Sequence, residues 1–143
     1  MKNVEIKFKK THEDAKLPFK KRESDTGWDV FAVEDKLIPA KGSAVIDIGL
    51  NLAYITPGYW IQIATRSGLG FKHGLMCHAG IVDCEYRGNM GIKIYNLSDT
   101  DYQVQKGDRI AQLIVFENYN TTIDFGEIDE TERGESGFGS SGR

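Results

Sequence analysis

The chain has 143 residues, of which 40% are hydrophobic, and a formal net charge of −3. This length is typical of one domain with an ordinary core, and the charge excludes a general attraction to the phosphate backbone of nucleic acids. Two cysteines and three histidines show neither zinc spacing nor a disulfide framework. No apolar run is long enough to cross a bilayer, and the N-terminal residues read as a strand rather than a signal peptide, so we expect a cytoplasmic protein.

Short segments with period-two alternation follow one another along the chain. The first alternates Val4, Ile6 and Phe8 against charged residues. After a polar loop over residues 10–25, further strands are predicted at 26–32, 44–48, 51–55 and 59–64. Helical periodicity is almost absent, so we expect an all-β sandwich or barrel.

The strand at 59–64 is followed by Arg66-Ser67-Gly68, the start of a segment that contains several glycines. If Ser67 caps a short helical turn, the free N–H groups of that turn are suited to a phosphate, and the Arg66 guanidinium adds a bidentate donor. The alternative is an ordinary capped turn with a solvated arginine.

Residues 79–96 predict a β-hairpin. The arms are the apolar pair Ile81-Val82 and an alternating strand over 90–96, and the polar residues 84–88 form the loop between them. This places Asp83 and Tyr86 at the mouth of the hairpin. A polar connection over 97–105 follows.

Asp83 comes directly after two β-branched residues. A stiff strand end suits a general base that holds a water in attack geometry, whereas the alternative is a carboxylate that only caps a turn. Gly80 and Gly91 lie on the two predicted arms. Two facing glycines suggest a slot in which a planar ligand group contacts the backbone directly, without intervening side chains.

Two polar residues stand in apolar surroundings. Asp29 interrupts the strand at 26–32, either as a bulge or edge carboxylate or as a functional group. Gln112 shares a face with Ile110 and with apolar residues 114 and 116 if the strand within 106–116 is regular. A glutamine in that position either satisfies a buried backbone group or donates to a ligand.

The composition changes at Gly126, after which acidic residues lead into a Gly- and Ser-rich end. Residues 137–142 match GxGxxG, but no strand precedes them, so a dinucleotide site is excluded. The tail is either a flexible terminus or a glycine-hinged lid with one stacking ring, Phe138, and arginines and serines for anions.

Five stretches in order resemble the homotrimeric dUTP diphosphatase family: residues 26–30, 66–69, 80–96, 107–114 and 133–142. The resemblance implies a jelly-roll-like β fold over residues 1–125, a Gly-rich lid over 126–143, and a homotrimer with three sites, each built from three subunits. It also implies hydrolysis of dUTP to dUMP and pyrophosphate with Mg2+.

The resemblance assigns roles to individual residues. Asp83 would activate the attacking water, and Asp29 would anchor Mg2+ through water molecules or order the phosphate-side arginine. Tyr86 would pack on the deoxyribose, and Phe138 would stack on the uracil. All the substrate-binding assignments are Arg66, Ser67, Gly68, Gly80, Ile81, Tyr86, Gly91, Gln112, Arg133, Phe138, Gly139 and Ser140.

Four positions depart from the usual family pattern: Thr26, Trp28, Thr65 (where proline is common) and His78 (where a small residue is common). None removes a group with an assigned chemical role, and His78 is a candidate modifier of nucleotide affinity. Two other functions fit parts of the chain. One is a dCTP deaminase of similar fold, and the other is a protein-interaction module whose tail orders when nucleotide binds.

Overall fold

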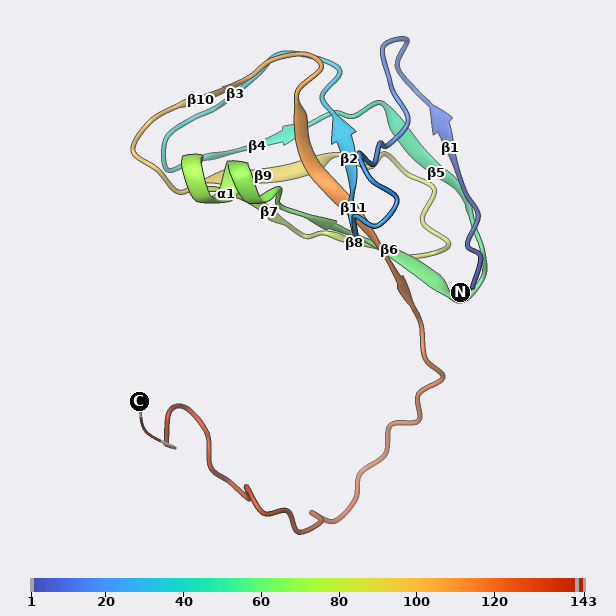
Figure 1. Cartoon of the computed structure of the whole chain (residues 1–143), viewed down its shortest axis with the longest axis vertical. Helices are drawn as coiled ribbons and strands as arrows, with labels where there is room; N and C mark the ends of the chain where they lie inside the picture. Colours follow the sequence, from blue (N-terminus) through green and yellow to red (C-terminus); the bar gives the residue numbers. More distant parts are fainter. Residues whose placement is uncertain (1, 141, 143) are drawn as a thin grey trace.

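The computed structural model describes residues 2–140 and 142 and shows an all-β body with one short helix and an extended C-terminal segment (Figure 1). The elements are β1 (Ile6–Lys10), β2 (Trp28–Phe31), β3 (Lys36–Ile38), β4 (Ser43–Ile46), β5 (Leu50–Ile55), β6 (Tyr59–Ala64), α1 (Ser67–His73), β7 (Leu75–His78), β8 (Ile81–Val82), β9 (Ile92–Asn96), β10 (Tyr102–Val104) and β11 (Arg109–Glu117). The helix of the described chain is too short to cross a membrane.

The strands form small antiparallel sheets that pack as a sandwich. A four-stranded sheet has the order β2-β11-β6-β8, and a three-stranded sheet has the order β4-β9-β7. Two further pairs, β1-β5 and β10-β3, complete the layers. The predicted all-β, jelly-roll-like sandwich is therefore confirmed.

The core between the sheets is built largely from isoleucine. Ile38, Ile46, Ile61 and Ile92 are fully buried and belong to four different strands. β-Branched side chains fit the pleated surface of a sheet and lose little rotamer freedom when they pack there. The same residues therefore favour the strands and fill the space between them.

Several strand predictions are confirmed and three strands were missed. The predicted strand at 59–64 coincides with β6, and the strands at 44–48 and 51–55 appear as β4 and β5. The missed strands are β3, β7 and β10, of which β10 lies in the expected polar connection at 97–105. β3 and β10 each have three residues and one buried side chain, which is too little for period-two alternation to be visible.

The predicted hairpin over residues 79–96 is wrong. β8 pairs with β6 and not with β9, whereas β9 pairs with β4 and β7. The loop between β8 and β9 carries the chain from one sheet to the other, so the two arms lie in different layers. The alternation within the second arm is nevertheless real, because Met90, Ile92 and Ile94 are all buried.

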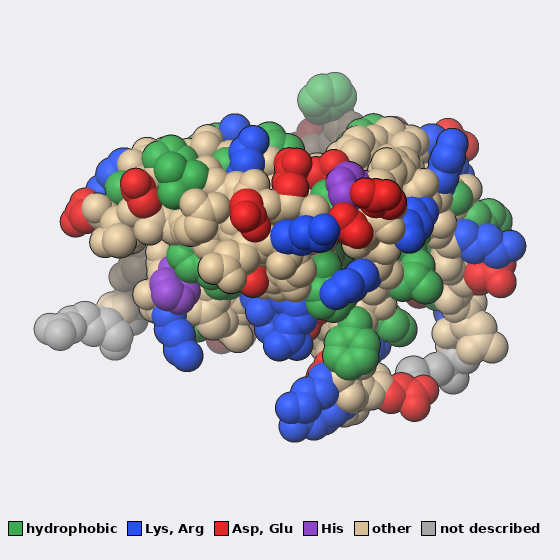
Figure 2. All heavy atoms as spheres, turned by 90° about the horizontal axis from the view of Figure 1, so that it is seen from above, with side chains coloured by type: hydrophobic (Ala, Val, Ile, Leu, Met, Phe, Trp, Pro, Cys, Tyr) green, Lys and Arg blue, Asp and Glu red, His purple; other side chains and the backbone are tan. Residues whose placement is uncertain are grey.

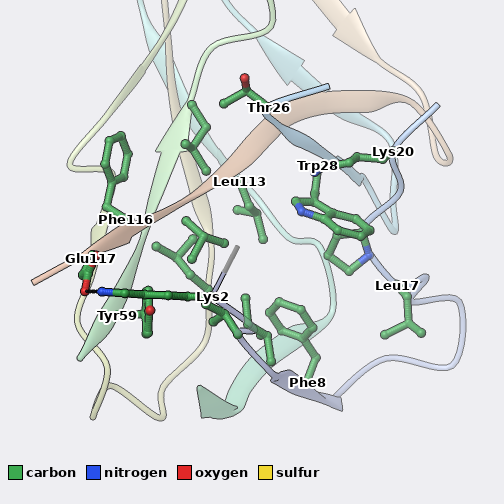
Figure 3. A pocket seen from close by; sticks show the side chains of 16 residues that line it. Lys2, Phe8, Leu17, Lys20, Thr26, Trp28, Tyr59, Leu113, Phe116 and Glu117 are labelled. Atoms are coloured by element: carbon green, nitrogen blue, oxygen red, sulfur yellow. Dashed lines mark hydrogen bonds and ion pairs between the residues drawn. The ribbon is translucent and has the colours of Figure 1, made fainter. Parts of the chain in front are cut away.

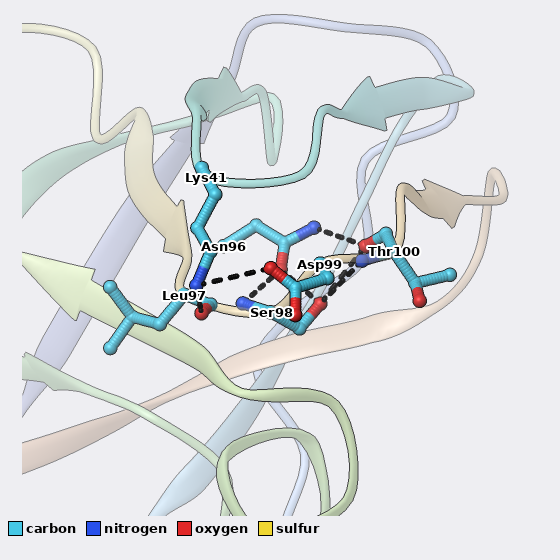
Figure 4. Close-up of polar contacts among 6 residues, drawn as sticks. All are labelled: Lys41, Asn96, Leu97, Ser98, Asp99 and Thr100. Carbon is cyan, nitrogen blue, oxygen red and sulfur yellow. Dashed lines mark hydrogen bonds and ion pairs between the residues drawn. The ribbon is translucent and has the colours of Figure 1, made fainter.

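Asn96 ends β9 as a buried amide whose hydrogen bonds organise the following loop (Figure 4). Its Nδ2 donates to the carbonyl oxygens of Ile38 at 3.0 Å and Thr100 at 2.8 Å. Its Oδ1 accepts from the backbone N–H and the hydroxyl of Ser98 at 3.0 and 2.7 Å. The loop also holds α1, because Leu97 N–H donates to the Gly74 carbonyl at 2.9 Å.

The chain leaves the body at the end of β11. Residues 118–140 contain no helix or strand, and they run away from the sandwich in Figure 1. Large apolar side chains on this segment, Ile123, Phe125, Ile128 and Phe138, are almost fully exposed. Of the predicted lid, Ser141 and Arg143 lie outside the described residues.

Candidate active site

One row of residues crosses the four-stranded sheet near the start of α1. Asp29 of β2 stands opposite Gln112 of β11, which stands opposite Ala64 of β6. Arg66 follows Ala64 by two residues. Antiparallel pairing therefore gathers a carboxylate, an amide and a guanidinium that are far apart in the sequence.

Asp29 holds two arginines. Its Oδ1 accepts from Arg66 Nε at 3.0 Å and its Oδ2 accepts from Arg109 NH1 at 3.3 Å. Arg66 NH1 also donates to the Arg109 carbonyl at 3.2 Å. The Asp29 side chain is 19% exposed, and in such partly dry surroundings a hydrogen bond between charged groups contributes about 1.5–3 kcal/mol. The sequence did not identify Arg109, which the shared carboxylate brings into this cluster.

Gln112 shares its face with Ile114 and Phe116 as predicted, because β11 pairs with β6 in unbroken register over 112–117, but the predicted place of Ile110 on that face is wrong. The pairing of β11 with β2 shifts register between Arg109 and Ala111, so Ala111 and Leu113 are buried while Gln112 is only half-buried. Gln112 Nε2 donates to the Thr65 carbonyl at 2.9 Å, which is the first of the two alternatives. Gly27 makes room for it, since a Cβ at that position would lie 2.0 Å from Gln112 Oε1.

The predicted helical turn after β6 exists as α1, but the predicted serine cap is wrong. Arg66 occupies the N-cap position with extended backbone, Ser67 is the first helical residue, and no side chain caps the helix. Ser67 and Gly68 are exposed, and the Arg66 side chain is directed to Asp29. The start of α1 therefore presents its first N–H groups beside an anchored guanidinium, an arrangement suited to phosphate oxygens. We refer to Asp29, Arg66, Ser67, Gly68, Arg109 and Gln112 as the phosphate-side group.

Asp83 and Tyr86 lie on the loop between β8 and β9. The Tyr86 N–H donates to the Asp83 carbonyl at 3.0 Å, and the Tyr86 hydroxyl donates to the Asn89 carbonyl at 2.8 Å. The ring lies against Gly88, where a Cβ would be 2.4 Å from the hydroxyl oxygen. Among the described residues, no hydrogen bond or ion pair occupies the Asp83 carboxylate, which is exposed. The loop is thus rigid while its carboxylate is free.

The two predicted slot glycines contact different sheets. A Cβ at Gly80 would lie 2.3 Å from the Ile63 carbonyl oxygen of β6, and one at Gly91 would lie 2.8 Å from Val45 of β4. The close backbone approach expected at Gly80 is therefore present. Because the hairpin does not exist, the interpretation of Gly80 and Gly91 as facing partners across it is wrong.

Asp83, which follows β8, and Arg66, which follows β6, lie towards opposite ends of β6. Val82 pairs with Ile61 near the start of β6, so Asp83 continues towards the end that begins at Tyr59. Arg66 follows the other end of the same strand. At 3.3 Å per residue, the two backbones are separated by roughly 15–20 Å. A single chain therefore divides the predicted site residues into two groups.

The tail residues are not brought to either group. Arg133 Nε donates to the Ser136 carbonyl at 2.7 Å within the tail itself. Phe138 is fully exposed and has a φ of 50°, and Gly139 follows it with a φ of 81°. Ser140 closes a turn by donating its N–H to the Gly137 carbonyl at 3.0 Å.

The apolar groove in Figure 3 has a volume of about 710 Å³ and is not this site. It contains none of the predicted site residues. Its floor consists of side chains from β1, β6 and β11, and a Lys2–Glu117 ion pair spans one edge. On the face shown in Figure 2, acidic and basic side chains are interspersed and neither sign forms a continuous patch.

Neither the Cys77 thiol nor a cluster of metal-ligating side chains among the described residues offers further chemistry to the site. Burial raises the pKa of the Cys77 thiol, so little thiolate forms at neutral pH. Within residues 2–140, no three His, Cys, Asp or Glu side chains gather around one point. Both Asp29 oxygens already accept from arginines, which favours the alternative in which Asp29 orders Arg66 over the one in which it anchors Mg2+ through water molecules.

The family model of dUTPase matches residues 13–142 of the chain. This chain belongs to the dUTPase family. The family match favours the diphosphatase interpretation over the deaminase. The deoxyuridine 5'-triphosphate nucleotidohydrolase of Helicobacter pylori strain J99 is 41% identical over an alignment of 142 residues that covers 97% of this chain and 97% of that protein.

Solved dUTPases share this fold. The dUTPase of Staphylococcus bacteriophage 80alpha with dUPNHPP has a TM-score of 0.87 at 28% identity, covering 97% of this chain and 99% of that chain. A mutant dUTPase of phage phi11 of S. aureus, whose structure reveals the coordination of a structural Mg(II) ion, has a TM-score of 0.74 at 27% identity. It covers 90% of this chain and 99% of that one.

Gly80→Ala should destabilise this dUTPase-family chain, because the new Cβ has no space beside the Ile63 carbonyl. We expect a loss of about 1–3 kcal/mol in the free energy of unfolding, measured by urea denaturation. Gly126→Ala is the matched control, since nothing lies within 4 Å of a Cβ there. Equal stability of the two variants would contradict the close approach at Gly80.

Proposed function

We propose that this chain hydrolyses dUTP to dUMP and pyrophosphate. Membership of the dUTPase family carries the proposal, and the free carboxylate of Asp83 on a rigid loop supports it. Asp83 would take a proton from a water that attacks the α-phosphorus. The bond between that phosphorus and the bridging oxygen to the β-phosphate breaks, and pyrophosphate leaves.

The two residue groups divide the substrate between them. The loop would hold the nucleoside, with the backbone near Gly80, Ile81 and Gly91 reading uracil and the Tyr86 ring against the deoxyribose. The hydrogen bond from the Tyr86 hydroxyl to the Asn89 carbonyl would hold the ring in place against the sugar, where it would leave no room for a 2′-hydroxyl. Arg66, Ser67, Gly68 and Gln112 would bind the triphosphate, and the ion pair with Asp29 keeps the Arg66 guanidinium in place before substrate arrives.

Magnesium would arrive on the triphosphate. The phosphate-side group offers one carboxylate, Asp29, which is already shared by two arginines, so phosphate oxygens and water would supply most of the coordination. When bound, the ion neutralises charge on the phosphates. The arginine side chains perform the same function from the protein side.

We propose a homotrimer, the assembly that the resemblance to homotrimeric dUTP diphosphatases implies, in which Asp83 and Arg66 of one chain would belong to different sites. The divergence of the two groups along β6 supports a site that takes the Asp83 loop from one subunit and the Arg66 turn from another. The two free cysteines favour a cytoplasmic location for the assembly.

The tail would complete a site on a neighbouring subunit. It exposes Ile123, Phe125 and Phe138 on an extended backbone, which is unfavourable in water unless another surface covers them. The groove in Figure 3 begins at Phe116 and Glu117, where the tail leaves the body, and its apolar lining suits such side chains from a second copy. Arg133, Phe138, Gly139 and Ser140 would then reach the nucleotide.

The substrate is tested by pyrophosphate release from dUTP, with dCTP, dTTP and UTP as controls, with and without Mg2+. We expect fast release from dUTP with Mg2+ and little from the other three. Ammonia release from dCTP would instead favour the deaminase. Tight binding of dUTP without any turnover would favour the nucleotide-gated interaction module.

Asp83→Asn should keep nucleotide affinity and lose turnover, since it replaces a base with an amide of the same shape. The expected fall in kcat is about 10²–10⁴-fold, with the Kd for a non-hydrolysable imido analogue of dUTP unchanged. An equal loss of affinity and rate would show that Asp83 binds substrate rather than activating water.

A shared site predicts complementation between inactive variants. Asp83→Asn chains retain Arg66, and Arg66→Ala chains retain Asp83, so a mixed trimer contains some intact sites. Refolding the two together at equal concentration should restore about a quarter of wild-type activity. A mixture of Asp83→Asn with Asp83→Ala is the control, because both substitutions remove the same carboxylate and no mixed trimer contains an intact site. If the first mixture gains no more than the control, the two groups act within one subunit.

A further inference from the structure

Thr65 occupies the junction between β6 and α1 and contacts three other elements. Its hydroxyl oxygen accepts from the Cys77 N–H of β7 at 2.9 Å. Its carbonyl oxygen accepts from Gln112 Nε2 of β11 at 2.9 Å. Its methyl group faces α1, where a Cβ at Gly70 would lie 3.4 Å from Thr65 Cγ2. Thr65 therefore ties the turn that carries Arg66 to β7 and to β11.

The hydroxyl joins two sheets. β6 belongs to the four-stranded sheet and β7 to the three-stranded sheet, and backbone pairing does not connect them directly. The Thr65–Cys77 hydrogen bond fixes their separation at the point where α1 begins. The Thr65 carbonyl connects the same turn to β11, because it accepts a hydrogen bond from the Gln112 side-chain amide.

We propose that Thr65 is a positioning residue for the triphosphate. Its hydroxyl holds the Arg66–Gly68 turn against β7 while its carbonyl holds Gln112 beside the same turn, and so Thr65 determines how the phosphates are held relative to the attacking water. The inference rests on the proposed hydrolysis of dUTP. A small displacement of such a turn reduces catalysis strongly, because the reacting atoms need near-attack geometry.

The test compares Thr65→Val, which keeps the shape and removes the hydroxyl, with Thr65→Ser, which keeps the hydroxyl. Thr56→Val is the matched control, because the Thr56 hydroxyl also accepts a backbone N–H, from Glu5 at 2.8 Å, in the turn between β5 and β6. For each variant, kcat, KM for dUTP and Tm are measured. The Kd values of the imido analogue of dUTP and of deoxyuridine are measured as well.

We expect Thr65→Val to lower kcat/KM by about tenfold or more and to weaken binding of the imido analogue while leaving deoxyuridine affinity unchanged. Thr65→Ser should retain most of the activity, and Thr56→Val should lower Tm without changing kcat/KM. If Thr65→Val does not fold, Thr65→Ala is used with the same expectation.

Two results would overturn the role of Thr65 alone: a Thr65→Val enzyme with wild-type kcat/KM, or a parallel loss of deoxyuridine and imido-analogue affinity. The latter would indicate general loosening of the fold. A wild-type chain that does not hydrolyse dUTP would overturn the proposed function and this inference together. The wild-type assay therefore separates the two failures.

Discussion

The antiparallel pairing of β2, β11 and β6 is the constraint on which the phosphate-side group depends. It sets Asp29, Gln112 and Ala64 in one row, so Arg66, which follows the end of β6, and Arg109, which begins β11, lie at the same end of the sheet. The Asp29 carboxylate then draws Arg66 and Arg109 together. Without that carboxylate, two guanidinium groups would be close together with no opposite charge, and neither would have a defined position.

The same strand also separates Asp83 from Arg66 within one chain. β8 runs antiparallel to β6, so it delivers Asp83 to the end of β6 that lies away from Arg66. The loop that carries Asp83 is held by its own hydrogen bonds and needs no substrate to acquire its shape. A free base on one edge and anchored arginines on another suit a site that is completed by association of copies.

The sequence predicted the β6 strand and the turn after it, and it singled out Asp29, Asp83 and Arg66 as site candidates, because these inferences depend on local patterns and on side-chain type. It failed at the hairpin over residues 79–96. Alternation shows which face of a strand is buried, but it contains no information on which strand lies beside it. β8, with two residues, had no pattern from which a partner could be inferred.

The contacts of three residues separate what the sequence predicts from what only the tertiary structure shows: Gln112, Arg109 and Thr65. The sequence by itself determined an all-β chain, the residue types that suit phosphate and water chemistry, and the need for a hydrogen bond at Gln112. The tertiary structure alone decided that this bond goes to the Thr65 carbonyl, that Arg109 shares Asp29, and that Asp83 and Arg66 diverge. These outcomes depend on strand register and on a register shift in β11, which arise from long-range pairing between segments that no local pattern connects.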